Sequence, residues 1–302
     1  MYASHAPFGG NVVGIRAAAL KYFNRRPEQL SWAEAALLAV LPNAPALLYP
    51  GKNNTLLKQK RDGLLAKLYR EGVMSEDSYH LALAEPLPEK KFDIPTVAPH
   101  LLAKAYREKK GKVCPTYIDG RLQKKINEFV ERHTALLSQN YIYNMAVLVA
   151  HVPTGEVRAY VGNSAPRKGS RGNDVDIVQA VRSSGSILKP ALYACMLQSG
   201  FILPGTLVPD IPSRFGSYSP SNFNRDFKGV VPARQALAQS LNIPFVRLLK
   251  DYSYARFYDD LKQLGIRSLN RDADHYGLSL ILGGAETSLW DICNLYGGMS
   301  AV

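Results

Sequence analysis

With 302 residues, of which 46% are apolar and 21% charged, the chain is long enough for two ordinary domains, each with its own hydrophobic core. Its net charge of +12 at pH 7 is spread evenly along the sequence, which argues against a dedicated nucleic-acid-binding tail. The three cysteines lie far apart and the six histidines are scattered, so the sequence predicts neither a disulfide framework nor a metal site.

The first part of the chain is predicted to be helical. Ser31 and Glu34 have the spacing of a capping box, and they open an apolar helix that ends at Pro42. Residues 54–70 carry leucines at helical spacing, and Ser75 begins another short helix. These elements predict a helical domain over residues 1–85.

The stretch that follows is rich in proline. Residues 85–99 hold four prolines among charged residues, a composition typical of a linker, and we place the linker at 86–112. No signal peptide and no apolar run long enough to cross a bilayer is evident in the sequence.

Residues 113–302 predict an α+β domain. Asp119 is placed to cap an amphipathic helix over 120–138, with Leu122, Ile126, Phe129 and Val130 on one face. Two β-rich runs, 145–152 and 156–161, flank a Pro-Thr-Gly turn and predict a hairpin. Helices then alternate with loops rich in proline and asparagine, and the last helix is expected at 286–302.

Ser186 and Lys189 form an S-x-x-K pair, which predicts a nucleophile beside its base. A serine is a poor nucleophile unless another group takes its proton, and on a helix beginning near Ser186 the two side chains share a face. Gly185 permits a sharp turn into that helix, whose N-terminus favours a developing oxyanion. To act as a base, Lys189 must have its pKa lowered by burial and a nearby cation. Taken alone, such a pair more often consists of two surface residues.

The tripeptide S-x-N occurs three times, at 138–140, 240–242 and 268–270. The first precedes the nucleophile at the end of a long helix, and the third lies in a charged stretch. Ser240-Leu241-Asn242 follows an amphipathic run and precedes Pro244, so we expect it in a loop between two helices, facing a cleft. Its position therefore makes the copy at 240–242 the candidate site motif.

Four segments of the sequence resemble those of a known protein family. The segments RSSGSILKPALYA and VPARQALAQSLNIPFVRLL resemble the transpeptidase domain of class A, or bifunctional, penicillin-binding proteins. Upstream, APFGGNVVGIRAAALKYFNR and LSWAEAALLAVLPNAPALLYP resemble the last third of the family-51 glycosyltransferase domain, which precedes the transpeptidase in such enzymes. The resemblance implies the mostly helical end of a lysozyme-like glycosyltransferase domain, followed by an incomplete α+β penicillin-binding domain related to serine β-lactamases.

The resemblance also implies roles for four residues. Ser186 would be the nucleophile acylated by a D-Ala-D-Ala stem peptide or a β-lactam, and Lys189 its general base. Ser240 would relay protons, and Asn242 would bind the peptide amide. The implied partners are peptidoglycan stem peptides, lipid II and β-lactams as covalent inhibitors, with no nucleic acid and no cofactor for the transpeptidase. The parent protein would work at the periplasmic side of the bacterial inner membrane, held by an N-terminal anchor.

Two departures from the family pattern bear on activity. No Lys-Thr-Gly or Lys-Ser-Gly occurs in the chain, so we expect that motif beyond Val302. The catalytic glutamates of the glycosyltransferase, with a divalent metal as a possible cofactor, are expected upstream of Met1. Glu34 is no substitute, because its capping-box setting makes it structural. Arg61 matches a late arginine of that domain, but is equally compatible with a solvated surface charge.

Two alternatives remain open at the level of the sequence. A serine β-lactamase or β-lactam sensor shares S-x-x-K, although the glycosyltransferase-like segments argue against it. A non-catalytic scaffold of the cell wall is the other alternative, because both active sites are incomplete in these residues.

Overall fold

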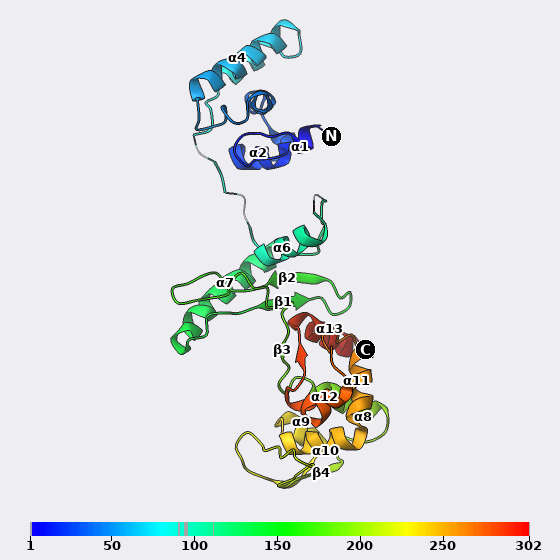
Figure 1. Ribbon diagram of the computed structural model, residues 1–302. Coiled ribbons are helices and arrows are strands. Elements are labelled where there is room, and N and C mark those ends of the chain that lie inside the picture. The colour runs from blue at the N-terminus through cyan, green and yellow to red at the C-terminus, as the bar shows by residue number, and fades with distance from the viewer. Residues whose placement is uncertain (1, 90, 94–95, 111, 302) are drawn as a thin grey trace. The chain divides into compact units, whose positions relative to one another are not determined.

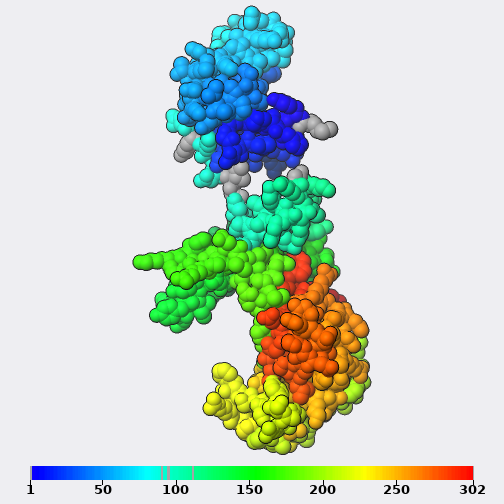
Figure 2. All heavy atoms as spheres, viewed as in Figure 1, coloured from blue at the N-terminus to red at the C-terminus, as the bar shows by residue number. Residues whose placement is uncertain are grey.

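The structure is a computed structural model that describes residues 2–89, 91–93, 96–110 and 112–301. The chain forms two compact units, Met1–Thr96 and Val97–Val302. Figures 1 and 2 colour the first unit blue to cyan and the second from turquoise through green to red. Within the predicted linker, positions 90, 94–95 and 111 lie outside the described residues.

The first unit is helical, as the sequence predicts. Its helices are α1 (Tyr2–His5), α2 (Ile15–Phe23), α3 (Trp32–Val40), α4 (Asn54–Arg70) and α5 (Glu76–Ala84), with 3-10 turns at Pro27–Gln29 and Leu41–Asn43. Ser31 caps α3 and Ser75 caps α5, which confirms both predicted starts. The core beneath them is apolar, and the Tyr22 hydroxyl within it donates to the Phe8 carbonyl at 2.8 Å.

Two charged residues of this unit have structural roles. Glu34 completes the predicted capping box: its carboxylate accepts from the Ser31 N–H at 2.9 Å, and its own N–H donates to Ser31 Oγ at 3.1 Å. Arg61 is only 1% exposed, so its interpretation as a solvated surface charge is wrong. Its guanidinium donates to the Glu85 carbonyl at 2.6 Å and to Asp62 Oδ1 at 2.8 Å, and thereby holds the chain just past the end of α5.

The second unit opens with α6 (Pro99–Glu108), α7 (Gly120–Leu137) and a 3-10 turn at Ser138–Asn140. Helix α6 lies inside the stretch assigned to the linker. Strands β1 (Val147–Ala150) and β2 (Val157–Val161) pair antiparallel, with Val147 opposite Val161, which confirms the predicted hairpin.

Helix α7 packs on the hairpin through a polar residue as well as apolar ones. Asp119 caps it as predicted, accepting from the N–H groups of Arg121 and Leu122. Buried Gln123 exchanges two hydrogen bonds with the backbone of Tyr160 on β2, at 2.8 and 3.1 Å. Of the predicted apolar face, Val130 is buried, but Phe129 is 41% exposed. The buried face of α7 is therefore rotated from the predicted one, so that Gln123 faces β2 and pairs with backbone N–H and C=O groups at the edge of that strand.

The remaining elements surround the main core of this unit. They are β3 (Arg182–Ser183), α8 (Lys189–Gln198), β4 (Leu207–Asp210), β5 (Gly229–Pro232), α9 (Ala233–Ala238), α10 (Asn242–Tyr252), α11 (Tyr254–Gln263), α12 (Ala273–Tyr276), a 3-10 segment Gly277–Leu282, β6 (Glu286–Thr287) and α13 (Leu289–Ser300). The last helix begins later than predicted, because residues 286–287 pair with β3 and Ser288 is its N-cap.

Helices α8, α10 and α11 pack together on this core (Figure 1). The start of α8 lies beside the start of α10, because their first residues, Lys189 and Asn242, share a hydrogen bond. Leu192, Phe245 and Leu261, one from each helix, have no exposed surface. Full burial of such side chains stabilises the fold by about 2 kcal/mol each. The helices that carry Lys189 and Asn242 are therefore anchored in the main core of the unit.

Candidate active site

Ser186 lies on a turn immediately before α8. Gly185 has φ +54, the left-handed conformation that glycine adopts without strain, as the predicted sharp turn requires. The helix begins at Lys189 rather than near Ser186, and Pro190 sits in its first turn as expected. The Ser186 carbonyl accepts from the Lys189 N–H at 3.1 Å. Its side chain is exposed, and the hydroxyl makes no hydrogen bond to any residue that the structure describes.

The turn that carries Ser186 is fixed from both sides. Before it, Ser183 Oγ donates to the Gly283 carbonyl at 2.8 Å, and the Ser184 N–H donates to the Ala285 carbonyl at 3.0 Å. After it, the Tyr296 hydroxyl on α13 donates to the Ile187 carbonyl at 2.9 Å. The backbone on both sides of Ser186 is thus held by residues about a hundred positions further along the chain, and its hydroxyl stays exposed.

A substitution at Gly283 tests whether this close contact fixes the turn that carries Ser186. Its φ is +100, and a Cβ there would lie 2.9 Å from the Gly185 nitrogen and 2.6 Å from Ser183 Oγ. We expect Gly283→Ala to lower the free energy of unfolding by about 2 kcal/mol and to speed hydrogen exchange at 183–187. Gly297→Ala is the matched control: it lies inside α13 with open space around its Cβ, and should stabilise by up to about 1 kcal/mol. Equal effects in denaturant melts would contradict the tight contact.

Lys189 is almost completely buried, with 1% of its surface exposed. Its amine donates to the Ser240 carbonyl at 2.7 Å, to Asn242 Oδ1 at 2.7 Å and to Ser240 Oγ at 3.3 Å. These three acceptors match the three N–H donors of an ammonium group. Burial lowers the pKa of Lys189 to about 8, and burial alone accounts for this shift, without the nearby cation that the sequence-based argument required.

The predicted S-x-N copy is the one that meets Lys189. Ser240 lies on the turn between α9 and α10, with φ +51, and Asn242 is the first residue of α10. The Asn242 amide also donates to the Ser221 carbonyl at 2.9 Å. The copy at 138–140 forms the 3-10 turn after α7, and the copy at 268–270 lies between α11 and α12. The structure therefore brings Lys189, Ser240 and Asn242 together, with Ser186 on the adjoining turn.

Sequence reasoning missed two buried polar residues next to this site. Asp210 at the end of β4 has no exposed surface, and Asn222 in the following loop is 3% exposed. Asn222 accepts from the N–H groups that open α10. Neither residue belongs to a periodic apolar pattern or to a sequence motif for a helix cap. The one signal in the sequence is Asp210 itself, an aspartate at the end of an otherwise apolar, strand-like run.

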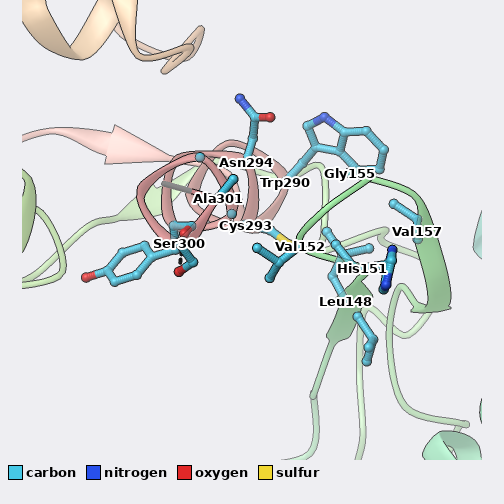
Figure 3. A pocket seen from close by; sticks show the side chains of 15 residues that line it. Leu148, His151, Val152, Gly155, Val157, Trp290, Cys293, Asn294, Ser300 and Ala301 are labelled. Carbon is cyan, nitrogen blue, oxygen red and sulfur yellow. Dashed lines mark hydrogen bonds between the residues drawn. The ribbon is translucent and has the colours of Figure 1, made fainter.

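A separate apolar cavity of about 560 Å³ lies between the hairpin and α13. Figure 3 shows Trp290 and Cys293 of α13 on one side of it, with Leu148 and Val152 of the hairpin on the other. None of the four predicted site residues lines this cavity. Within the described ranges, no cluster of histidine, cysteine and acidic residues is arranged to hold a metal ion. The same ranges contain no helix both long and apolar enough to span a bilayer.

Comparison with known families assigns two parts of the chain. Residues 145–297 match the family described as penicillin binding protein transpeptidase domain, and residues 1–69 match the transglycosylase family. A penicillin-binding transpeptidase domain preceded by transglycosylase sequence defines a bifunctional class. The chain belongs to the class A penicillin-binding proteins.

Individual relatives agree with this assignment. Penicillin-binding protein 1C of Escherichia coli is 34% identical over 98% of this chain, and penicillin-binding protein 1F of Bacillus subtilis is 28% identical over 95%. The chain spans 38% and 41% of the lengths of these relatives. The crystal structure of penicillin-binding protein 1A from Haemophilus influenzae has the same fold, with a TM-score of 0.64 at 17% identity, over 98% of this chain and 60% of its own.

Proposed function

We propose that the second unit carries out acyl transfer through Ser186 on D-Ala-D-Ala stem peptides, and that β-lactams acylate the same serine. One observation carries the proposal: the buried amine of Lys189 contacts both Ser240 and Asn242, one turn along the chain from the exposed Ser186 hydroxyl. A lysine amine with a pKa near 8 is partly neutral at physiological pH, which a general base requires.

The proposed reaction has two steps. Neutral Lys189 takes the Ser186 hydroxyl proton as Oγ attacks the carbonyl carbon of the penultimate D-alanine. The bond to the terminal D-alanine breaks, and the proton passes to the leaving amine with Ser240 Oγ as relay. An amine of a neighbouring stem peptide then attacks the ester carbonyl and forms the cross-link, while the ester C–O bond breaks. A proton of that amine passes to Lys189 and on to Ser186 Oγ, which restores the hydroxyl. Asn242 binds the amide of the stem peptide, and the transpeptidase step uses no cofactor.

The whole protein would be a peptidoglycan synthase. The transglycosylase match over 1–69 supports glycan polymerisation from lipid II in the parent enzyme, at the periplasmic face of the inner membrane. A divalent metal, where one takes part, would belong to the glycosyltransferase site. The same match favours a bifunctional synthase over a stand-alone β-lactamase or β-lactam sensor.

Labelling with a fluorescent penicillin tests the proposal directly. We expect one covalent label per chain, located at Ser186 by peptide mass spectrometry and abolished by Ser186→Ala. Ser184→Ala is the matched control, because the Ser184 hydroxyl is buried without a hydrogen-bond partner in the part of the chain that the structure describes. It should label like the unmodified protein. A folded sample that takes no label would favour the non-catalytic scaffold instead.

A further inference from the structure

Helix α10 carries Asn242 of the site but does not provide its own N-cap. The residue at the cap position is Leu241, whose side chain has no hydrogen-bond acceptor. The first N–H groups of a helix lack partners inside the helix and need an acceptor from elsewhere. Here that acceptor comes from the loop after β4: Asn222 Oδ1 accepts from the Asn242 N–H at 2.9 Å and from the Ile243 N–H at 3.3 Å.

The amide of Asn222 is oriented by a buried carboxylate. Asn222 Nδ2 donates to Asp210 Oδ1 at 2.7 Å, while Asp210 Oδ2 accepts from the Lys228 N–H at 3.0 Å. Nδ2 also donates to the Asp226 carbonyl at 3.0 Å. Because a carboxylate with both oxygens engaged by N–H donors only accepts, the NH₂ of Asn222 must face Asp210 and its oxygen must face α10. Asp210 thus determines which way the cap points.

The same loop also holds the side chain of Asn242. Its Nδ2 donates to the Ser221 carbonyl at 2.9 Å, which leaves Oδ1 directed at the Lys189 amine at 2.7 Å. Residues 221 and 222 therefore fix both the backbone and the side chain of Asn242. A continuous series of hydrogen bonds runs from Asp210 through Asn222 and Asn242 to Lys189.

We propose that Asp210 and Asn222 are positioning residues for the acyl-transfer site: they hold the first turn of α10 so that Asn242 Oδ1 stays on the Lys189 amine. The inference rests on the proposed function for its effect on the reaction. A purely structural cap would stabilise α10 without influencing Lys189. A positioning role requires in addition that the charge state of Lys189 depends on Asp210 and Asn222.

Three variants separate these roles. Asp210→Asn turns one acceptor oxygen into an NH₂ donor, which must then face either the NH₂ of Asn222 or the N–H of Lys228. Asn222→Leu removes the cap and keeps the branched shape of the side chain, with two methyl groups in place of the amide oxygen and NH₂. The double variant Asp210→Asn/Asn222→Asp exchanges donor and acceptor, so that the new carboxylate caps α10 and accepts from residue 210. It loses the bond to the Asp226 carbonyl and places a carboxylate oxygen opposite that carbonyl, so the exchange restores the network only in part. Asn224→Ala, an exposed asparagine in the same loop, is the matched control.

Two readouts are measured on the folded full chain. The first is the rate of penicillin acylation of Ser186 across pH. The second is the titration of the Lys189 Cε resonance in protein labelled with ¹³C-lysine, assigned with Lys189→Arg, which needs no catalytic activity. We expect each single variant to slow acylation about tenfold, as loss of a helix cap at a reacting group implies. The Lys189 titration should move to lower pH, because an acceptor of its ammonium is displaced.

The double variant should recover part of both effects, and Asn224→Ala should show neither. The proposal is overturned if the Lys189 titration and acylation rate of Asp210→Asn match those of Asn224→Ala, or if the double variant is no better than the singles. If Asn222→Leu does not fold, the test relies on Asp210→Asn, which exchanges a single oxygen for NH₂. A wild-type protein that takes no penicillin refutes the proposed function, while the Lys189 titration still decides the positioning role.

Discussion

Replacing Lys189 by methionine should slow acylation of Ser186 by fluorescent penicillin by about a thousandfold, within the range that a general base contributes. Methionine is unbranched like lysine and one atom shorter, and it has no group that takes a proton. In the unmodified protein the rate should rise with pH and level off above about 8, because that is the pKa of the buried amine.

The measurement is the second-order rate of labelling between pH 6 and 9.5, on samples whose fold is checked by circular dichroism. Lys250→Met, an exposed lysine on α10, is the control and should retain the wild-type rate and pH profile. A rate that is independent of pH, or a Lys189→Met variant that labels normally, would remove Lys189 from the role of base.

The same substitution should make the fold more stable at neutral pH. The pKa of Lys189 falls from 10.5 in water to about 8 in the folded chain, so the folded state disfavours the ammonium form. Below pH 8 the group is charged in both states and the full cost applies; between pH 8 and 10.5 the folded state alone is neutral and the cost disappears. The shift corresponds to about 3 kcal/mol.

Denaturant melts of the wild type and Lys189→Met at pH 7 and pH 10 test this expectation. At pH 7 the variant should be the more stable by up to about 3 kcal/mol, reduced by the hydrogen bonds that it loses to Ser240 and Asn242. At pH 10 most of this advantage should be gone. Comparing the two proteins at each pH cancels the titration of the tyrosines. An advantage that does not change with pH would mean that the Lys189 amine is not desolvated.

Together these predictions describe a site that is kept at a cost to stability. The three acceptors around Lys189 satisfy an ammonium group, whereas the acyl transfer that we propose needs the neutral amine. A pKa near 8 is compatible with both requirements. The ammonium form keeps its three hydrogen bonds, and part of the population is neutral at physiological pH. Stability sacrificed at a reacting group is common in enzymes.

Local features of the fold follow from the amino-acid sequence. The capping residues Ser31, Ser75 and Asp119, together with the β1–β2 hairpin, all lie where short-range patterns predict them, because a cap or a tight turn depends on residues a few positions apart. The choice of the second S-x-N copy also came from sequence, through its place between two helical runs.

Burial and long-range hydrogen bonds, by contrast, were decided by the tertiary structure alone. Lys189 and Ser240 are 51 positions apart, and only the packing of α8 against α10 removes the amine from water and lowers its pKa. Arg61 and Asn222 are polar residues in unremarkable local sequence, and each is buried because carbonyl or N–H groups from distant segments need a partner. Sequence thus determined which residues to suspect, whereas packing determined their ionisation and orientation, because desolvation arises only once separate segments meet.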